Sequence, residues 1–104
     1  MAALEAEVAA QLALKALISK AGLEPPRLHS VRRLLAYVAE VLGGSIDDSV
    51  REFTRLKRKE LIILERAREA GQYGLVPVDR EETQIAVRIA VEVVKLVEKL
   101  WKMD

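Results

Sequence analysis

The stretch IAVRIAVEVVKLVEKLWK, residues 85–102, decides the fold class. By propensity alone, its many Val and Ile residues favour a β-strand. Its charged residues instead recur at spacings of three or four, which places them on one face of a helix. They are Arg88, Glu92, Lys95, Lys99 and Lys102. The period of two that marks a half-buried strand is missing, so the pattern predicts a long helix that ends near Lys102.

Three more helices are expected upstream, over residues 2–21, 31–42 and 49–70. Typical helix start and stop signals flank them: Gly22, Pro25, Pro26, Ser30, Gly43 and Gly44. Residues 45–49 are expected to form a loop, and 71–78 a second loop. Ser49 with Glu52, and Asp79 with Glu82, fit capping boxes. Short connections between long helices imply antiparallel neighbours, so we predict an all-α, up-and-down four-helix bundle that forms one domain over residues 1–104.

The first expected helix is apolar around most of its circumference. Only one narrow polar stripe interrupts it, formed by Glu7, Gln11, Lys15 and Ser19 at spacings of four. So wide an apolar arc needs neighbours on several sides. A second copy of the chain is the simplest cover for the excess, and a homodimer is therefore expected.

Composition excludes several kinds of chemistry. The chain of 104 residues has no Cys and one His, His29, which excludes thiolate chemistry, Cys-based metal sites and a His cluster within one chain. Phosphate-cradling Gly-rich loops and a Gly-x-Ser-x-Gly elbow are also absent. We expect no cofactor and no metal. Asp47 beside Asp48 is interpreted as helix capping, because two adjacent carboxylates are too few ligands for a cation.

Charge is balanced over the whole chain but not along it. The formal net charge is +1, whereas residues 27–68 carry ten cations against six acids. The N-terminus lacks the basic region of a signal peptide, and no apolar run approaches the length of a membrane span. The sequence therefore predicts a cytoplasmic protein with a basic middle. Its abundance of Glu, Lys and Arg would also suit a thermophile.

Two stretches carry a resemblance to a known family. LALKALISKAGLEPPRLHSVRRLLAYVAEVLG, residues 12–43, resembles the central part of HEPN domains, where a His-Ser or His-Asp pair opens a helix; here that pair is His29 and Ser30. Residues 60–100 resemble the family's last third, in which a helix ends near a Tyr-Gly pair before a Pro-containing loop and a long closing helix. Tyr73, Gly74 and Pro77 stand at those places.

The resemblance implies a helical bundle that is usually dimeric. It also implies an association with nucleotides, with minimal nucleotidyltransferase partners in toxin–antitoxin pairs, and with RNA cleavage in some branches. The nuclease branches carry an Arg four to six residues before a His. Here Arg27 stands only two positions before His29, and Gln72 replaces the Arg that many relatives place before the Tyr. A non-catalytic HEPN-type module is therefore the leading hypothesis.

The start of the second expected helix is the first candidate phosphate site. Free backbone N–H groups and the helix dipole attract anions there, and nearby arginines would add bidentate contacts. The candidate residues are Arg27, His29, Ser30, Arg32 and Arg33. The alternative interpretation leaves the arginines solvated or paired with nearby acids such as Glu40, and gives His29 a structural place in the loop.

The third expected helix offers a basic face, and the loop after it a polar pair. Arg51, Arg55 and Arg58 share one face by their spacing, and could meet phosphates or an acidic partner. The alternative is a solvated face with salt bridges. Gln72 and Tyr73 in the following loop could touch a base or ribose, or Tyr73 could simply pack on the bundle.

Two rival functions stay open beside the non-catalytic module. One is a diverged ribonuclease that uses His29 with Arg27, Arg32 or Arg33 across a dimer. The other is a purely structural interaction module that docks on a larger partner through its first helix.

Overall fold

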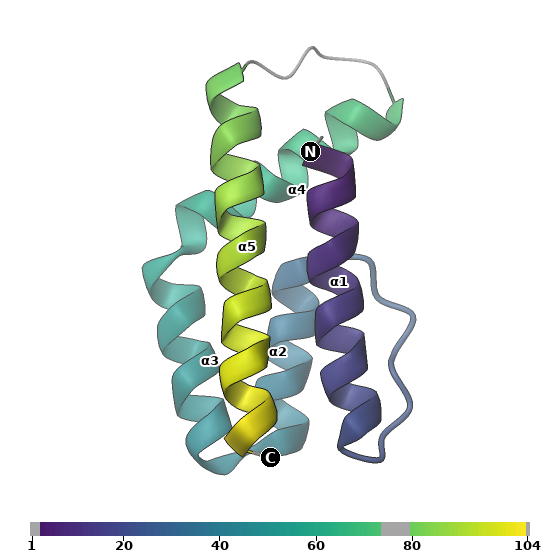
Figure 1. The fold of residues 1–104 in the computed structure, drawn as a ribbon, viewed down its shortest axis with the longest axis vertical. Helices are drawn as coiled ribbons and strands as arrows, with labels where there is room; N and C mark the ends of the chain where they lie inside the picture. The colour runs from purple at the N-terminus through teal and green to yellow at the C-terminus, as the bar shows by residue number, and fades with distance from the viewer. Residues whose placement is uncertain (1–2, 74–79, 104) are drawn as a thin grey trace.

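The computed structural model describes residues 3–73 and 80–103, the side chains of 68–73 excepted. It consists of five helices: α1 (Ala3–Lys20), α2 (Val31–Leu42), α3 (Gly44–Leu56), α4 (Arg58–Tyr73) and α5 (Arg80–Met103). No strand occurs within the described ranges (Figure 1). The predicted all-α bundle and its long final helix are confirmed.

The core is centred on α1 and α5, which share more contacts than any other pair of helices. α1 buries Leu14, Leu17 and Ile18 in this core, and α2 and α4 also contribute buried side chains to it. Among the residues that the structure describes, every fully buried apolar side chain is aliphatic, and aromatic residues make up only 4% of the chain. The aliphatic faces of the helices therefore supply the hydrophobic stabilisation of the fold.

The helices do not simply alternate in direction. In Figure 1, α1, α2 and α5 run downward, α3 runs upward, and α4 crosses obliquely behind α5 toward the upper right. The short turns before α3 and α4 leave α2 and α3 antiparallel, as short connections predict. The connection from Lys20 to Val31 is longer, and it returns along the bundle before α2 starts. Ten extended residues can span about 33 Å, enough to set α1 and α2 parallel.

The predicted third helix is two helices, α3 and α4, with a break at Lys57. The break lets α3 bury Ile46 and Val50 while α4 changes direction and buries Leu61 and Leu64. The prediction of a loop over 45–49 is wrong, because α3 already starts at Gly44. Its N-cap is Gly43 with φ 59°, which also caps the end of α2, so the Ser49–Glu52 capping box is wrong too.

Other predicted helix ends are confirmed. Gly22 adopts φ 84°, and the amide of Leu23 bonds the carbonyl of Ile18, which is a Schellman ending for α1. The Ser30 side chain accepts a hydrogen bond from the amide of Arg33 and caps α2. α4 continues through Tyr73, so Gln72 and Tyr73 belong to its last turn and not to the predicted loop. Asp79 lies outside the described residues, so the structure does not test the capping box of Asp79 with Glu82.

The polar stripe of α1 faces inward over its first half. Glu7 is 0% exposed and Gln11 is 7% exposed, because α2 and the segment before it cover this side. The outward side instead carries Val8, 41% exposed, and Leu12, 61% exposed. The first half of α1 therefore buries Glu7 and Gln11 and exposes Val8 and Leu12 to solvent.

Candidate functional site

The predicted phosphate site at the start of α2 is filled by a carboxylate of the chain itself. Glu65 of α4 accepts hydrogen bonds from Ser30 Oγ at 2.6 Å and from the Arg32 amide at 3.3 Å. Arg32 Nε donates to its second oxygen at 3.1 Å. The physical expectation of an anion at this helix end was sound, but the anion is Glu65.

His29 contributes its backbone and leaves its ring exposed. Gln11 Nε2 donates to the His29 carbonyl oxygen at 2.7 Å and also contacts both carboxylate oxygens of Glu7, at 2.7 and 2.6 Å. The side chains of His29, Arg27 and Arg33 are exposed on the surface around this junction. The contact made by the His29 carbonyl supports the structural interpretation of this residue.

The predicted basic face is divided between two helices. Arg51 forms an ion pair with Asp47 one turn earlier in α3. Arg55 lies near the end of α3, whereas Arg58 opens α4 beyond the break at Lys57, so the three arginines do not share one helix. Arg55 and Arg58 are exposed and have no ion pair with any described residue. The side chains of Gln72 and Tyr73 lie outside the described residues.

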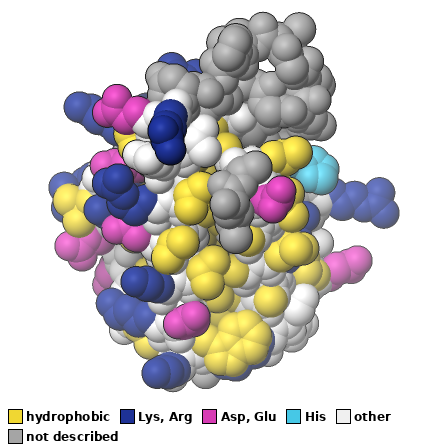
Figure 2. All heavy atoms as spheres, turned by 45° about the horizontal axis from the view of Figure 1, so that its top comes forward, with side chains coloured by type: hydrophobic (Ala, Val, Ile, Leu, Met, Phe, Trp, Pro, Cys, Tyr) yellow, Lys and Arg dark blue, Asp and Glu magenta, His cyan; other side chains and the backbone are white. Residues whose placement is uncertain are grey.

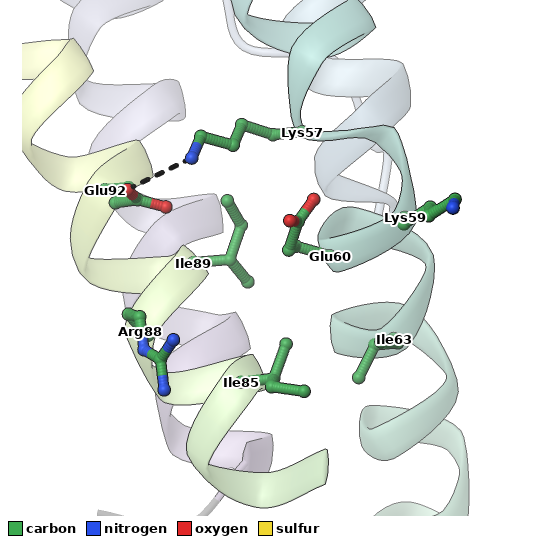
Figure 3. Close-up of a pocket in the computed structure, with 8 residues that line it drawn as sticks. All are labelled: Lys57, Lys59, Glu60, Ile63, Ile85, Arg88, Ile89 and Glu92. Atoms are coloured by element: carbon green, nitrogen blue, oxygen red, sulfur yellow. Dashed lines mark ion pairs between the residues drawn. The ribbon is translucent and has the colours of Figure 1, made fainter. Parts of the chain in front are cut away.

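A groove of about 350 Å³ lies between α4 and α5, and we name it the α4–α5 groove. Figure 3 shows Ile85 and Ile89 of α5 facing Ile63 of α4 across it. Lys57 Nζ lies 3.5 Å from Glu92 Oε1 at one end. The remaining lining residues are Lys59, Glu60 and Arg88. The groove thus combines an aliphatic floor with a charged rim.

A second groove, of about 250 Å³, lies on the other side of α5 and is named the α1–α5 groove. Its lining is mostly small or aliphatic: Ala6, Ala9, Val87, Ala90, Val91, Val94, Lys95 and Glu98. Figure 2 shows hydrophobic side chains gathered along the middle of the face over α1 and α5. Val91 is 46% exposed here, and Val8 and Leu12 of α1 are exposed too, although they do not line the groove. We call the groove together with these two residues the α1–α5 face.

Neither groove offers a metal site. Within residues 3–73 and 80–103, as far as side chains are described, no group of three His, Cys, Asp or Glu could hold an ion. None of the described helices combines the length and the apolar character needed to cross a bilayer. The side chains that line both grooves are apolar or charged.

Sequence reasoning missed both grooves and the anchoring role of Glu65. A signal existed for Lys57, since the spacing of Ile46, Val50 and Phe53 makes position 57 the next inward position. A cation at an inward position indicates a break in the helix or a charged partner, and the structure has both: the helix breaks at Lys57, and Lys57 forms a partly exposed ion pair with Glu92. No local signal links Glu65 to Ser30, because 35 residues separate them.

Comparisons with curated proteins and with solved structures find no match for this chain. A model of one protein family, described as the HEPN domain, matches residues 1–100. This match covers both resembling stretches and nearly the whole described bundle. The chain therefore belongs to the HEPN domain family.

Proposed function

We propose that this chain is a non-catalytic interaction module of the HEPN family that works as a homodimer joined through its α1–α5 face. The observation that carries the proposal is the apolar α1–α5 groove, with Val8 and Leu12 of α1 exposed as well. Contiguous apolar surface on a small protein marks an interaction site.

A second copy of the chain fits this surface by shape and charge. Ala6, Ala9 and Ala90 are small, so a neighbouring helix could approach α1 and α5 closely. The rim carries one cation, Lys95, and one acid, Glu98, one turn apart on α5. A face with both signs of charge can meet its own copy across a two-fold axis without forcing like charges together.

The family also implies binding partners for the proposed dimer. The dimer would present its remaining surfaces to a partner such as a minimal nucleotidyltransferase, in a toxin–antitoxin-like pair. Nucleotide binding at the start of α2 has weaker support, because a phosphate would have to replace the Glu65 carboxylate there. Calorimetric titration with mononucleotides tests that part, and heat of binding lost in Arg33→Ala would support it.

A diverged ribonuclease has less support from the described contacts. A general base needs a positioned partner. The ring of His29 is exposed and forms no hydrogen bond or ion pair with any described residue. Cleavage of labelled RNA that is lost in His29→Ala would overturn the non-catalytic part of the proposal.

The homodimer is tested with two leucines that are matched in exposure. Leu12 lies on the α1–α5 face at 61% exposed, and Leu56 lies at the end of α3 at 60% exposed. Light scattering after size exclusion should give the wild type twice the chain mass of 11.6 kDa. Leu12→Glu should shift the protein to monomer, and Leu56→Glu should not. A monomeric wild type, or equal behaviour of the two variants, would contradict the homodimer.

A further inference from the structure

The break between α3 and α4 lacks the residues that usually end a helix. Lys57 stands at the break with φ −109° and ψ 16°, and neither Gly nor Pro lies within residues 51–62. The Lys57 amide still bonds the Phe53 carbonyl, and the Leu61 amide bonds the Lys57 carbonyl, with the spacing of an unbroken helix. A change of backbone angles centred on this one residue could therefore join α3 and α4 into a continuous helix.

Joining the two helices would give partners to backbone groups at the break. The helix stops at Leu56 and restarts at Arg58, so the helical ladder is interrupted between them. The last carbonyls of α3 and the first amides of α4 thereby lose partners that a continuous helix would supply. Lys57 cannot cap α4 with its side chain, because an ammonium group only donates hydrogen bonds. The break is thus imposed by packing and not by local sequence.

The charges at the start of α4 also disfavour the break. Lys57, Arg58 and Lys59 stand at the positive end of the α4 dipole, which repels cations. The first turn of α4 has one acid, Glu60, to offset them. A continuous helix would place the three cations in its middle, away from either end, and would remove this repulsion.

The break divides the bundle into two halves, α1–α3 and α4–α5. In Figure 1, α4 turns away from α3, and the two helices contact each other little. The most extensive contact, between α1 and α5, joins the halves. Ser30 Oγ also donates to Glu65, and Lys20 Nζ to the Trp101 carbonyl, across the same boundary. Contacts of this kind can form again between halves that belong to different copies of one chain.

We infer that two copies of this chain can exchange halves, with α3 and α4 joined into one continuous helix in each copy. α1–α3 of one copy then pack on α4 and α5 of its partner, so the contacts between the halves are kept and the helical ladder becomes continuous. Both copies line each α1–α5 groove of such a dimer. The inference does not rest on the proposed homodimer through the α1–α5 face, because the exchanged contacts lie inside the bundle.

The first test uses Leu12→Glu, which should prevent association through the α1–α5 face. The variant is unfolded in urea and refolded at high and at low protein concentration. High concentration should trap a dimer, because halves of different copies meet as they fold. Size exclusion with light scattering should show that this dimer persists after dilution, since the halves separate only when the bundle unfolds. Monomer alone at every concentration would overturn the inference.

Two hinge variants in the Leu12→Glu background test the continuous helix. Lys57→Ala and Lys57→Gly both remove the ion pair with Glu92 and differ in helix propensity. Ala favours a continuous helix, whereas Gly favours the break. The exchanged dimer of Lys57→Ala should be about 20-fold tighter than that of Lys57→Gly, or about fourfold to fivefold for each of the two hinges. Equal dissociation constants would contradict a continuous helix at residue 57.

Two charge variants provide a matched pair of opposite sign. Arg55 lies in the last turn of α3, Arg58 opens α4, and both are exposed. Arg55→Glu puts an acid at a helix end that disfavours it, and Arg58→Glu puts one at a helix start that favours it. Arg55→Glu should therefore raise the dimer fraction and Arg58→Glu should lower it, by about twofold to fivefold for each hinge. Shifts in the same direction would speak against the inference.

Spin labels measure the helix directly, because the chain has no Cys that would compete for labelling. Ser45→Cys with Ile62→Cys places labels on α3 and α4, at two exposed positions. Labelled protein is refolded with excess unlabelled protein, so that each dimer contains one labelled chain. Electron–electron resonance should give about 26 Å in the dimer, the span of a continuous helix, and a shorter distance in the monomer. A dimer with the monomer distance would refute the joined helix.

The two associations can fail separately. Leu12→Glu should abolish the dimer through the α1–α5 face and keep the exchange of halves, whereas Lys57→Gly should do the reverse. A wild type that dimerises but never yields a dilution-resistant dimer contradicts only the exchange. A monomeric wild type that yields such a dimer after refolding contradicts only the α1–α5 homodimer.

Discussion

The two grooves beside α5 differ in the side chains that they expose to solvent. The α1–α5 groove has six apolar lining residues and only Lys95 and Glu98 at its edge. The α4–α5 groove has three isoleucines among five charged residues. One helix thus supplies both surfaces, and its 3.6-residue period sends neighbouring residues to different sides. Apolar surface favours association that tolerates salt, whereas a charged rim favours binding that salt weakens.

The largest expected effect concerns the floors of the two grooves. Ile89→Ala should lower the free energy of unfolding by about 2–5 kcal/mol, because Ile89 is 1% exposed and its loss leaves a cavity. Val91→Ala should cost less than about 1 kcal/mol, since Val91 is 46% exposed in the chain alone. Urea denaturation of both variants, with the dimer separated by dilution, measures the difference. Equal losses of unfolding free energy would mean that Ile89 and Val91 are equally buried.

Charge placed in the α1–α5 groove should come next in size. Val91→Glu buries a carboxylate at the proposed dimer contact and should raise the dimer dissociation constant at least about 100-fold, or about 2.7 kcal/mol. Arg88→Glu lies in the other groove and should leave the constant within about threefold. Sedimentation equilibrium measures both variants, and a dimer weakened equally by the two would erase the distinction between the grooves.

Salt should separate the grooves with a smaller effect. Raising the ionic strength from about 0.05 to 0.5 M shortens the Debye length roughly threefold, so the coupling between Lys57 and Glu92 at the rim of the α4–α5 groove should weaken. The dimer constant should change little or tighten, since apolar association does not depend on charge attraction. A double-mutant cycle of the ion pair and sedimentation of the dimer, along the same salt series, provide the check. A dimer that dissociates as the salt concentration rises would show that charge attraction holds the α1–α5 face together, which would contradict this prediction.

The smallest effect belongs to the ion pair at the end of the α4–α5 groove. Lys57 and Glu92 are more than one-third exposed, so the pair should contribute less than about 1 kcal/mol to folding. A double-mutant cycle with Lys57→Ala and Glu92→Ala measures the coupling. A coupling above about 2 kcal/mol would show that this end of the groove is as firmly packed as its floor.

Periodicity and capping residues predicted much of the fold. The spacing of charges in residues 85–102 predicted α5, and Ser30 and Gly22 predicted helix ends that the structure confirms. The family resemblance, drawn from residues 12–43 and 60–100, agrees with the family that matches. The break at Lys57 was missed because good helix formers surround it, and the break depends on how α3 and α4 pack.

The candidate site was less predictable because its partners are distant in the chain. A free helix start with three nearby arginines predicts anion binding, and only the fold brings Glu65 to that start. Glu7 and Gln11 look like surface residues by spacing, and only the returning segment before α2 buries them. Local sequence patterns identify the polar groups that need a hydrogen-bond or ion-pair partner, whereas the tertiary structure determines which residue is that partner.

The pairing of α1 with α5 has a consequence for synthesis in the cell. Among the described helices, α1 is synthesised first, and its most extensive contact is with α5, which is synthesised last. α1 therefore emerges from the ribosome with its aliphatic side chains exposed, and stays so until α5 has also emerged. Contacts so distant in sequence slow folding, and exposed apolar helices aggregate or recruit chaperones. Nascent chains halted before residue 80 should accordingly be sensitive to protease and bound by chaperones.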